Sequence, residues 1–129
     1  MITSIHAMFY SEDAPRTRAF LRDVLGWPWV EHVESSPGWL IFRSGPSEIG
    51  VHPTVSQWQG TTYSYPIHHS LSFMCDDIEA TVDELRAKGA TFRGEIEDMG
   101  FGRGLMMELP AAGEVLLYQP QHPTAFNLE

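Results

Sequence analysis

The clearest hydrophobic pattern in the chain lies in residues 69–88. Its first part alternates at a period of two, which predicts a strand. The apolar face of this strand is formed by Leu71, Phe73 and Cys75. Two consecutive aspartates then end the strand, and an aspartate there can cap the positive end of a helix. Apolar residues next recur at a helical period, on the face formed by Ile78, Val82 and Leu85. The pattern predicts a strand, a two-acid turn and an amphipathic helix.

The same order of elements occurs earlier in the chain. Residues 5–10 alternate, Glu12 and Asp13 interrupt the alternation, and an apolar helical pattern follows over 14–25. Pro15 falls in the first turn of this helix, where proline is tolerated. A strand–acid–helix unit is therefore present twice.

Each unit is followed by a predicted β-hairpin. The first hairpin pairs residues 39–43 with 48–52, and the second pairs 105–109 with 114–118. Both turns have four residues, and both second strands begin with glutamate. Such self-similarity indicates two copies of a βαβββ module of about 60 residues each.

The repeat sets the expected domain organisation. We expect one α+β domain over 1–129, with a first module at 4–52 and a second module at 68–120. The linker 53–67 is aromatic and is bounded by prolines, so we expect it to lie across a surface or a partner. The tail from residue 121 onward is expected to be peripheral.

Two four-stranded sheets, each with a helix on its outer face, would form a curved mixed sheet around a cleft. Period-two alternation divides the strand residues into a set beneath the helices and a set facing the cleft, and a bulge would exchange the two sets. The set expected to face the cleft is His6, Met8, Tyr10, Glu48, Gly50, His52, Glu114, Leu116 and Tyr118.

Composition narrows the possible partners. The apolar content of 43% is that of a globular protein, and the net charge of −9 disfavours binding to nucleic acid or to an anionic membrane. The apolar runs are too short to span a bilayer, and no signal peptide opens the sequence. A single cysteine, Cys75, forms no internal disulfide and suits a reducing cytoplasm, where we expect the protein. Its place on an apolar strand face indicates a small core residue rather than a nucleophile.

Three stretches, together with the paired hairpins, resemble the vicinal oxygen chelate superfamily, the glyoxalase, bleomycin resistance and extradiol dioxygenase group. These stretches are HAMFYSED from His6, AFLRDVLG from Ala19 and CDDIEATV from Cys75. The resemblance covers about residues 4–120. It implies paired βαβββ modules, a U-shaped cleft and frequently a homodimer. In enzymes of the family it also implies a divalent metal, held by residues of the first, fourth, fifth and eighth strands, usually His or Gln, Glu, His and Glu.

The resemblance implies the candidate metal ligands His6, Glu48, His69 and Glu114 for Zn, Ni, Mn or Fe. His6 lies seven residues before Asp13, which matches the spacing of the family's first ligand. The same spacing in the fifth strand falls on Ser70, so His69 lies one residue early. In the fourth and eighth strands the two glutamates lie two residues before the family's positions, about 7 Å along the strand.

Each candidate also has a plainer interpretation. His6 could be a hydrogen-bonded cavity histidine, and His69 a half-exposed one. Glu48 could pair with Arg43 across its hairpin, and Glu114 could be a solvated carboxylate after a turn. The candidates for binding a substrate are Trp39, His52, Tyr118 and Arg103. For Arg103 the alternative partner is an acidic neighbour.

Two functions remain open at this point. In the first, a metal chelates two adjacent oxygens of a small molecule and stabilises an oxyanion, while Glu114 moves a proton. Lyase, isomerase or dioxygenase chemistry would suit such a site. In the second, the cleft sequesters a small organic molecule without a metal, as bleomycin-resistance-type members of the family do. The sequence does not name the substrate, nor does it show whether one chain or two complete the cleft.

Overall fold

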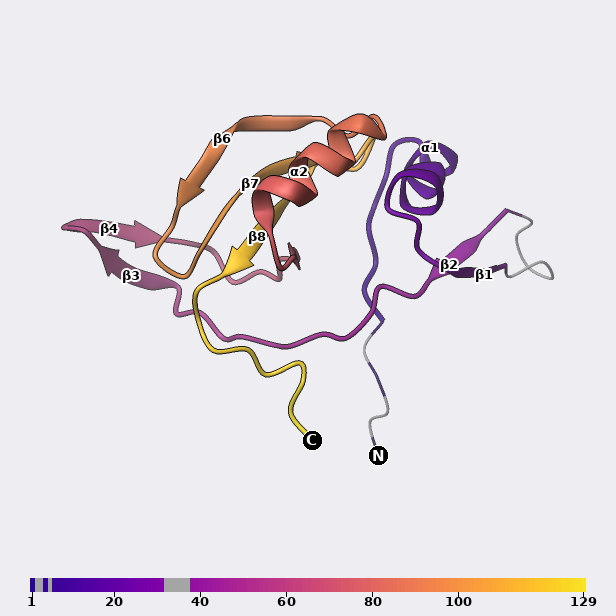
Figure 1. The fold of residues 1–129 in the computed structure, drawn as a ribbon. Coiled ribbons are helices and arrows are strands. Elements are labelled where there is room, and N and C mark those ends of the chain that lie inside the picture. Colours follow the sequence, from indigo (N-terminus) through magenta and orange to yellow (C-terminus); the bar gives the residue numbers. More distant parts are fainter. Residues whose placement is uncertain (2–3, 5, 32–37) are drawn as a thin grey trace.

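The computed structural model of the chain describes residue 1, residue 4, residues 6–31 and residues 38–129. Along the chain, a helical segment precedes one run of strands and a second helix precedes another run of strands (Figure 1). In order they are α1 (Ala14–Ala19), η1 (a π-helix, Phe20–Val24), β1 (Trp29–Glu31), β2 (Leu40–Phe42), β3 (Val55–Trp58), β4 (Thr61–Ser64), β5 (Ser72–Met74), α2 (Ile78–Ala87), β6 (Phe92–Asp98), β7 (Gly102–Glu108) and β8 (Glu114–Pro120). The fold class is α+β with mixed sheets, as the sequence predicts. In the described part of the chain, no helix is long and apolar enough to cross a membrane.

The strands of the described residues form three sheets. The largest has four strands in the order β5-β8-β7-β6, in which β5 runs parallel to β8 and the other neighbours are antiparallel. β1 pairs with β2, and β3 pairs with β4, in two separate antiparallel hairpins. Figure 1 shows α2 lying across the four-stranded sheet, while α1 and the β1–β2 pair lie beside it.

The two predicted acid-capped helices are confirmed. The Asp13 carboxylate accepts a hydrogen bond from the backbone N–H of Arg16 at 3.2 Å, and Asp77 accepts one from Ala80 at 3.0 Å. Each bond satisfies a donor that the first turn of a helix leaves without a partner. After α2 the chain passes through Gly89 at a φ of +100°, a conformation that favours glycine and ends the helix.

The core joins both helices to one face of the four-stranded sheet. Apolar residues of α2, β7 and β8 are buried together, and residues of η1 complete the same cluster. The cluster includes Ile78, Val82, Met107, Leu109, Val115, Leu117, Phe20 and Leu21. Val115 and Leu117 therefore lie on the helix side of β8, as the alternation predicts. The backbone N–H of Glu12 also donates to the Ala111 carbonyl oxygen at 2.9 Å, which ties the start of α1 to the β7–β8 turn.

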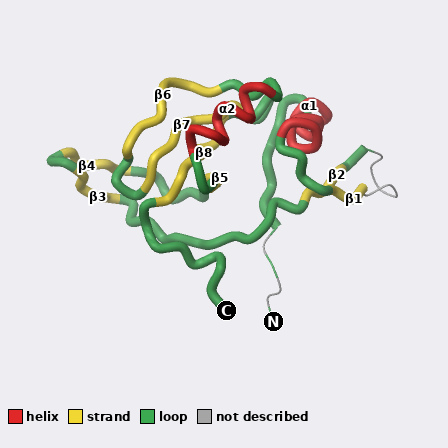
Figure 2. The backbone as a smooth tube through the Cα atoms, in the orientation of Figure 1, coloured by secondary structure: helices red, strands yellow, loops and turns green. Residues whose placement is uncertain are grey.

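The N-terminal half departs from the predicted pattern. The described residues of the segment 4–10 and the whole of 48–52 form no strand, so the prediction of two four-stranded sheets is wrong for this half. Figure 2 shows the described residues of both segments without helix or strand. A strand exists only where a neighbour accepts its hydrogen bonds, and among the residues that the structure describes these two segments have no such neighbour.

The linker 53–67 contains the hairpin β3–β4, which the sequence pattern did not predict. Gln59 and Gly60 form its turn with φ values of 49° and 77°. Two consecutive positive φ angles are typical of the tight turns that join antiparallel strands. β7 also begins at Gly102, three residues before the predicted start at residue 105.

Candidate functional site

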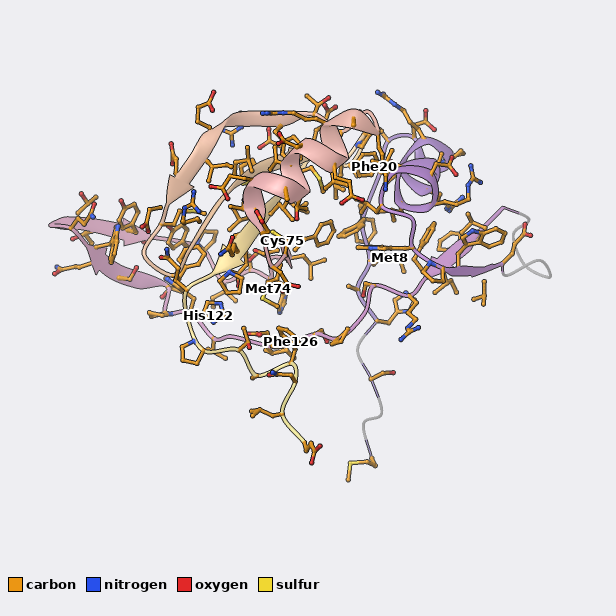
Figure 3. The ribbon with its side chains drawn as sticks, viewed as in Figure 1. Met8, Phe20, Met74, Cys75, His122 and Phe126 are labelled. Carbon is orange, nitrogen blue, oxygen red and sulfur yellow. The ribbon has the colours of Figure 1, made fainter. Side chains whose placement is uncertain are left out.

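A cavity of about 1770 Å³ separates the N-terminal half of the chain from β5 and α2. Its lining comes from the segment 6–11, the α1–η1 helix, residues 44–54, residues 65–75 and the C-terminal tail. Figure 3 places Met8 and Met74 on opposite sides of this space, with His122 and Phe126 contributed by the tail. Both halves of the chain thus contribute to one concave site.

Aromatic rings form the wall where the two halves meet. The rings of Trp27 and Phe73 meet edge to face with their centroids 5.2 Å apart, and Phe9 lies 6.3 Å from Phe73. Trp39 lines the same cavity, and the Arg18 guanidinium lies 4.9 Å from the centre of its ring. This wall offers apolar surface and ring faces to a bound molecule.

A second wall combines tyrosine with histidine. Tyr65 directly follows β4. Its ring meets the His52 ring edge to face, with the two centroids 5.9 Å apart. The His68 ring also lies near Tyr65, with their centroids 6.4 Å apart. Two imidazoles therefore lie beside one aromatic ring, and all three side chains line the cavity.

Tyr118 and His122 form a polar corner of the cavity. The Tyr118 hydroxyl lies 2.9 Å from His122 Nε2, and His122 Nδ1 lies 2.7 Å from the Pro123 carbonyl oxygen. Glu48 reaches the same region and accepts the backbone N–H of Ala125 at 3.3 Å. Burial, and next the negative charge of Glu48, raise the pKa of Tyr118, so its hydroxyl is protonated at neutral pH.

Two glycines of β7 make room for the Tyr118 ring. A Cβ atom at Gly102 would lie 2.6 Å from Tyr118 Cδ2, and one at Gly104 would lie 2.7 Å from Tyr118 Cβ. Real side chains do not approach so closely, so another residue would displace the Tyr118 ring or the Gln119 carbonyl group at Gly102, and the β8 backbone at Gly104, where the Leu117 carbonyl oxygen is the nearest atom. The Tyr118 ring also meets the Phe101 ring edge to face, with their centroids 5.4 Å apart. The place of Tyr118 is thus fixed by its neighbours on β7.

The four candidate metal ligands do not converge. His6, Glu48 and His69 line the cavity, where the two histidines are exposed, but Glu114 lies outside its lining. The Arg93 guanidinium holds Glu114 through bonds of 2.9 and 3.0 Å, and this lowers the pKa of Glu114. Among the residues that the structure describes, no three His, Cys, Asp or Glu side chains lie close enough together to hold an ion. The donor set in this arrangement does not fit a metal centre.

The candidate substrate-binding residues divide in a similar way. Trp39, His52 and Tyr118 line the cavity, whereas Arg103 does not. Arg103 forms an ion pair with Glu79 of α2, which lowers the pKa of Glu79, so its partner in this chain is an acidic neighbour. Glu48 is bonded to the tail, and no ion pair joins it to Arg43 in the described part of the chain.

The alternation also predicts that Met8 and Tyr10 face the cavity and that Ala7 and Phe9 face the helix. In the structure both sets line the cavity, because the segment lies in no sheet that would separate its two faces. Cys75 packs against the core, and burial raises the pKa of its thiol, which agrees with a structural role.

Sequence reasoning missed His122 and Phe126, which it placed in a peripheral tail. Both residues line the cavity. The available signal was the presence of an aromatic residue and a histidine in a short segment rich in proline, QPQHPTAF at 119–126. Rigid, amphipathic side chains of this kind are unusual in a tail that has no contacts.

Comparison with known proteins gives both a family and a fold. The family model described as "Glyoxalase/Bleomycin resistance protein/Dioxygenase superfamily" matches residues 3–116. No curated protein sequence matches the chain.

Several solved structures share the fold at low sequence identity. TnmS3, an antibiotic binding protein from Streptomyces sp. CB03234, is 16% identical with a TM-score of 0.61, over 94% of this chain and 99% of that one. A member of the same superfamily from Sphaerobacter thermophilus is 16% identical with a TM-score of 0.62, over 92% and 98%. Lactoylglutathione lyase from Agrobacterium tumefaciens is 14% identical with a TM-score of 0.59, over 91% and 92%. Similarity at this level extends to the fold alone.

Proposed function

Because the chain belongs to the glyoxalase/bleomycin resistance protein/dioxygenase superfamily, we propose that it binds a small organic molecule in its cavity without a metal ion. One observation carries the proposal. The cavity is lined by aromatic rings and imidazoles from both halves of the chain, while Arg93 holds the carboxylate expected to serve as ligand and base.

The chemistry of the cavity suits an organic ligand. Trp27, Trp39 and Phe73 offer flat apolar surface, and burial of such surface drives binding. A few polar groups at the edge, on His52 and Tyr118, would then fix the orientation of the ligand. A protein of the same fold is described as antibiotic binding, which favours a role in sequestering such a molecule.

A metal-dependent lyase, isomerase or dioxygenase is the second candidate. The placement of His6, Glu48 and His69 on one cavity favours it, and a protein of the same fold is a lactoylglutathione lyase. The ion pair between Arg93 and Glu114 weighs against it. Elemental analysis of the purified protein separates the two candidates, since the enzyme requires a bound metal at about one ion per site.

We also propose that a second copy of the chain covers part of this surface. A compact protein of 14.6 kDa exposes about 6,900 Å², whereas this chain exposes 9675 Å². The excess of roughly 2,800 Å² is well above the 800 Å² or so that each partner loses in a standard interface. It includes the segment 48–52, where Ile49 and Val51 are exposed and no strand pairs with the backbone.

Binding is tested by titrating chelator-treated protein with planar aromatic fragments and following tryptophan fluorescence. Trp39→Ala should weaken binding about tenfold, since it removes a ring face from the cavity. Trp29→Ala is the matched control, because Trp29 is similarly exposed, at 45% against 39%, but does not line the cavity. If chelation abolished binding and added metal restored it, the metal-free proposal would be overturned. Equal losses of binding in Trp39→Ala and Trp29→Ala would also overturn the proposal.

A further inference from the structure

We propose that the cavity selects ligands that donate hydrogen bonds, because three of its histidines, together with Tyr118 and Glu48, present acceptors to it. This inference rests on the proposed function and names the chemistry of the ligand. The matching molecule is a planar aromatic compound that carries hydroxyl or amino groups. An aromatic carboxylate is the opposite case, since it brings acceptors and a negative charge.

The first step is the tautomer of three cavity histidines. In each of them Nδ1 lies 2.7 Å from a backbone carbonyl oxygen of a nearby proline. The pairs are His52 with Pro53, His68 with Pro66 and His122 with Pro123. A carbonyl oxygen can only accept, so we assign the hydrogen of each neutral imidazole to Nδ1. The Nε2 atom of each ring therefore carries a lone pair and acts as an acceptor.

The second step is the direction of the bond between Tyr118 and His122. Since His122 Nε2 accepts, the Tyr118 hydroxyl must donate its single hydrogen across the 2.9 Å contact. The hydroxyl oxygen is left with its lone pairs, and a ligand can meet it only as a donor. His122 does not need to touch the ligand for this effect, so it is a positioning residue.

The third step is Glu48, whose carboxylate lies in the same corner. One of its oxygens accepts the backbone N–H of Ala125, and an ionised carboxylate has further lone pairs but no hydrogen to donate. On the other wall, the Nε2 atoms of His52 and His68 offer acceptors beside the Tyr65 ring. Acceptors thus lie next to aromatic rings in two parts of the cavity lining.

This arrangement discriminates between ligands, because an acceptor that loses its bound water and gains no donor from the ligand costs binding free energy. A ligand that covers Tyr118 and Glu48 without donating would leave their lone pairs unpaired. A site built around polar groups rejects an analogue that lacks the matching group far more strongly than an apolar pocket rejects a changed methyl. The preference for donors should therefore be visible with small probes.

The test uses three probes that share one ring system: β-naphthol, its methyl ether and the corresponding naphthoate. Naphthol donates one hydrogen bond, the ether donates none, and the naphthoate is an anionic acceptor. Calorimetry on the full chain should show naphthol binding about tenfold more tightly than the ether, with the naphthoate weakest. Equal affinities for naphthol and its ether, or tighter binding of the naphthoate, would overturn the inference.

Variants of the positioning residue identify which group sets the preference. In His122→Leu the Tyr118 hydroxyl is free to turn its hydrogen to the ligand, so the ratio of naphthol to ether affinities should fall toward one. In His122→Gln the amide oxygen can accept from Tyr118, so the ratio should be retained. Tyr63→Phe is the control for losing a hydroxyl, since Tyr63 does not line the cavity. If His122→Leu keeps the full ratio while binding naphthol normally, the assignment of the corner is wrong.

The two proposals fail in different ways. If the probes bind chelator-treated protein with equal affinities, the cavity binds organic molecules, and only the selection for donors is overturned. If binding requires added metal, the proposed function is overturned. If none of the three probes binds the folded wild-type protein, both proposals are overturned.

Discussion

At the scale of single residues, the surroundings of a side chain decide its chemistry. Glu114 is a carboxylate at the start of β8, where the family resemblance implies a ligand and a base. Its hydrogen bonds with Arg93 give it another role, because a carboxylate held by a guanidinium is a weaker base than a free one. Tyr118 is the opposite case: burial and Glu48 keep its hydroxyl protonated, so it can donate to His122.

The lowered pKa of Glu114 predicts how the Arg93 ion pair depends on pH. A carboxyl with a lower pKa in the folded state stabilises the fold above its unfolded pKa of about 4.3 and loses that effect as the pH falls further. Glu114→Gln should therefore lower the melting temperature slightly at pH 7, and the difference from wild type should shrink as the pH falls below the unfolded pKa. Circular dichroism melts measure this.

The control for that experiment is Glu95→Gln on β6. Glu95 takes part in no ion pair in the described part of the chain, so its replacement should give a difference that hardly changes with pH. A Glu114→Gln difference that is the same at pH 7 and pH 3 would contradict the assigned pair.

At the scale of elements, those that depend on neighbouring residues can be predicted from the sequence more readily than those that depend on contacts between distant residues. The acid-capped helices and the β7–β8 hairpin follow from neighbouring residues, and the sequence predicts them. Strand formation at 48–52 requires a partner strand, and the predicted partner, β2, pairs with β1 instead. Alternation alone does not show which of two segments a strand will pair with. The same limit applies to the site: His52 and Tyr118 could be selected by alternation, but His122 enters through the path of the tail.

The hairpin β3–β4 contacts the β6–β7 turn through Trp58. The Trp58 ring lies against Gly100, where even an added Cβ would come within 2.5 Å of it. Trp58→Ala should release the hairpin from the β6–β7 turn, and amide hydrogen exchange in residues 55–64 should rise at least about tenfold. Gln57→Ala, one residue away, should leave exchange close to wild type. Unchanged exchange in Trp58→Ala would mean that other contacts hold the hairpin.

At the scale of the whole molecule, the exposed area is the main anomaly. The chain exposes far more surface than its mass requires, and much of it is apolar and belongs to backbone without strand partners. A second copy could supply both the missing strand neighbours and the cover. The sequence resemblance implied a homodimer, but no pattern of residues shows which segments a partner would meet.

The proposed dimer is tested with a charge at its expected centre. Val51 is 97% exposed in the segment 48–52, so Val51→Asp should leave the single chain folded while weakening the dimer at least about a hundredfold. Light scattering with size-exclusion chromatography measures the mass. Leu128→Asp, at an exposed tail position, is the control and should stay dimeric. A wild-type protein of one chain's mass at micromolar concentration would contradict the proposal.

Gly102 and Gly104 have a consequence for how this protein can diverge. Neither residue has a side chain that could meet a ligand, yet a methyl group at Gly102 would crowd the Tyr118 ring, and one at Gly104 would crowd the β8 backbone that carries Tyr118. The cavity could therefore acquire a new specificity through a mutation on the neighbouring strand, with every ligand-contacting residue intact. A change of ligand between relatives of this chain should first be sought in variation at Gly102 and Gly104, rather than in the lining itself.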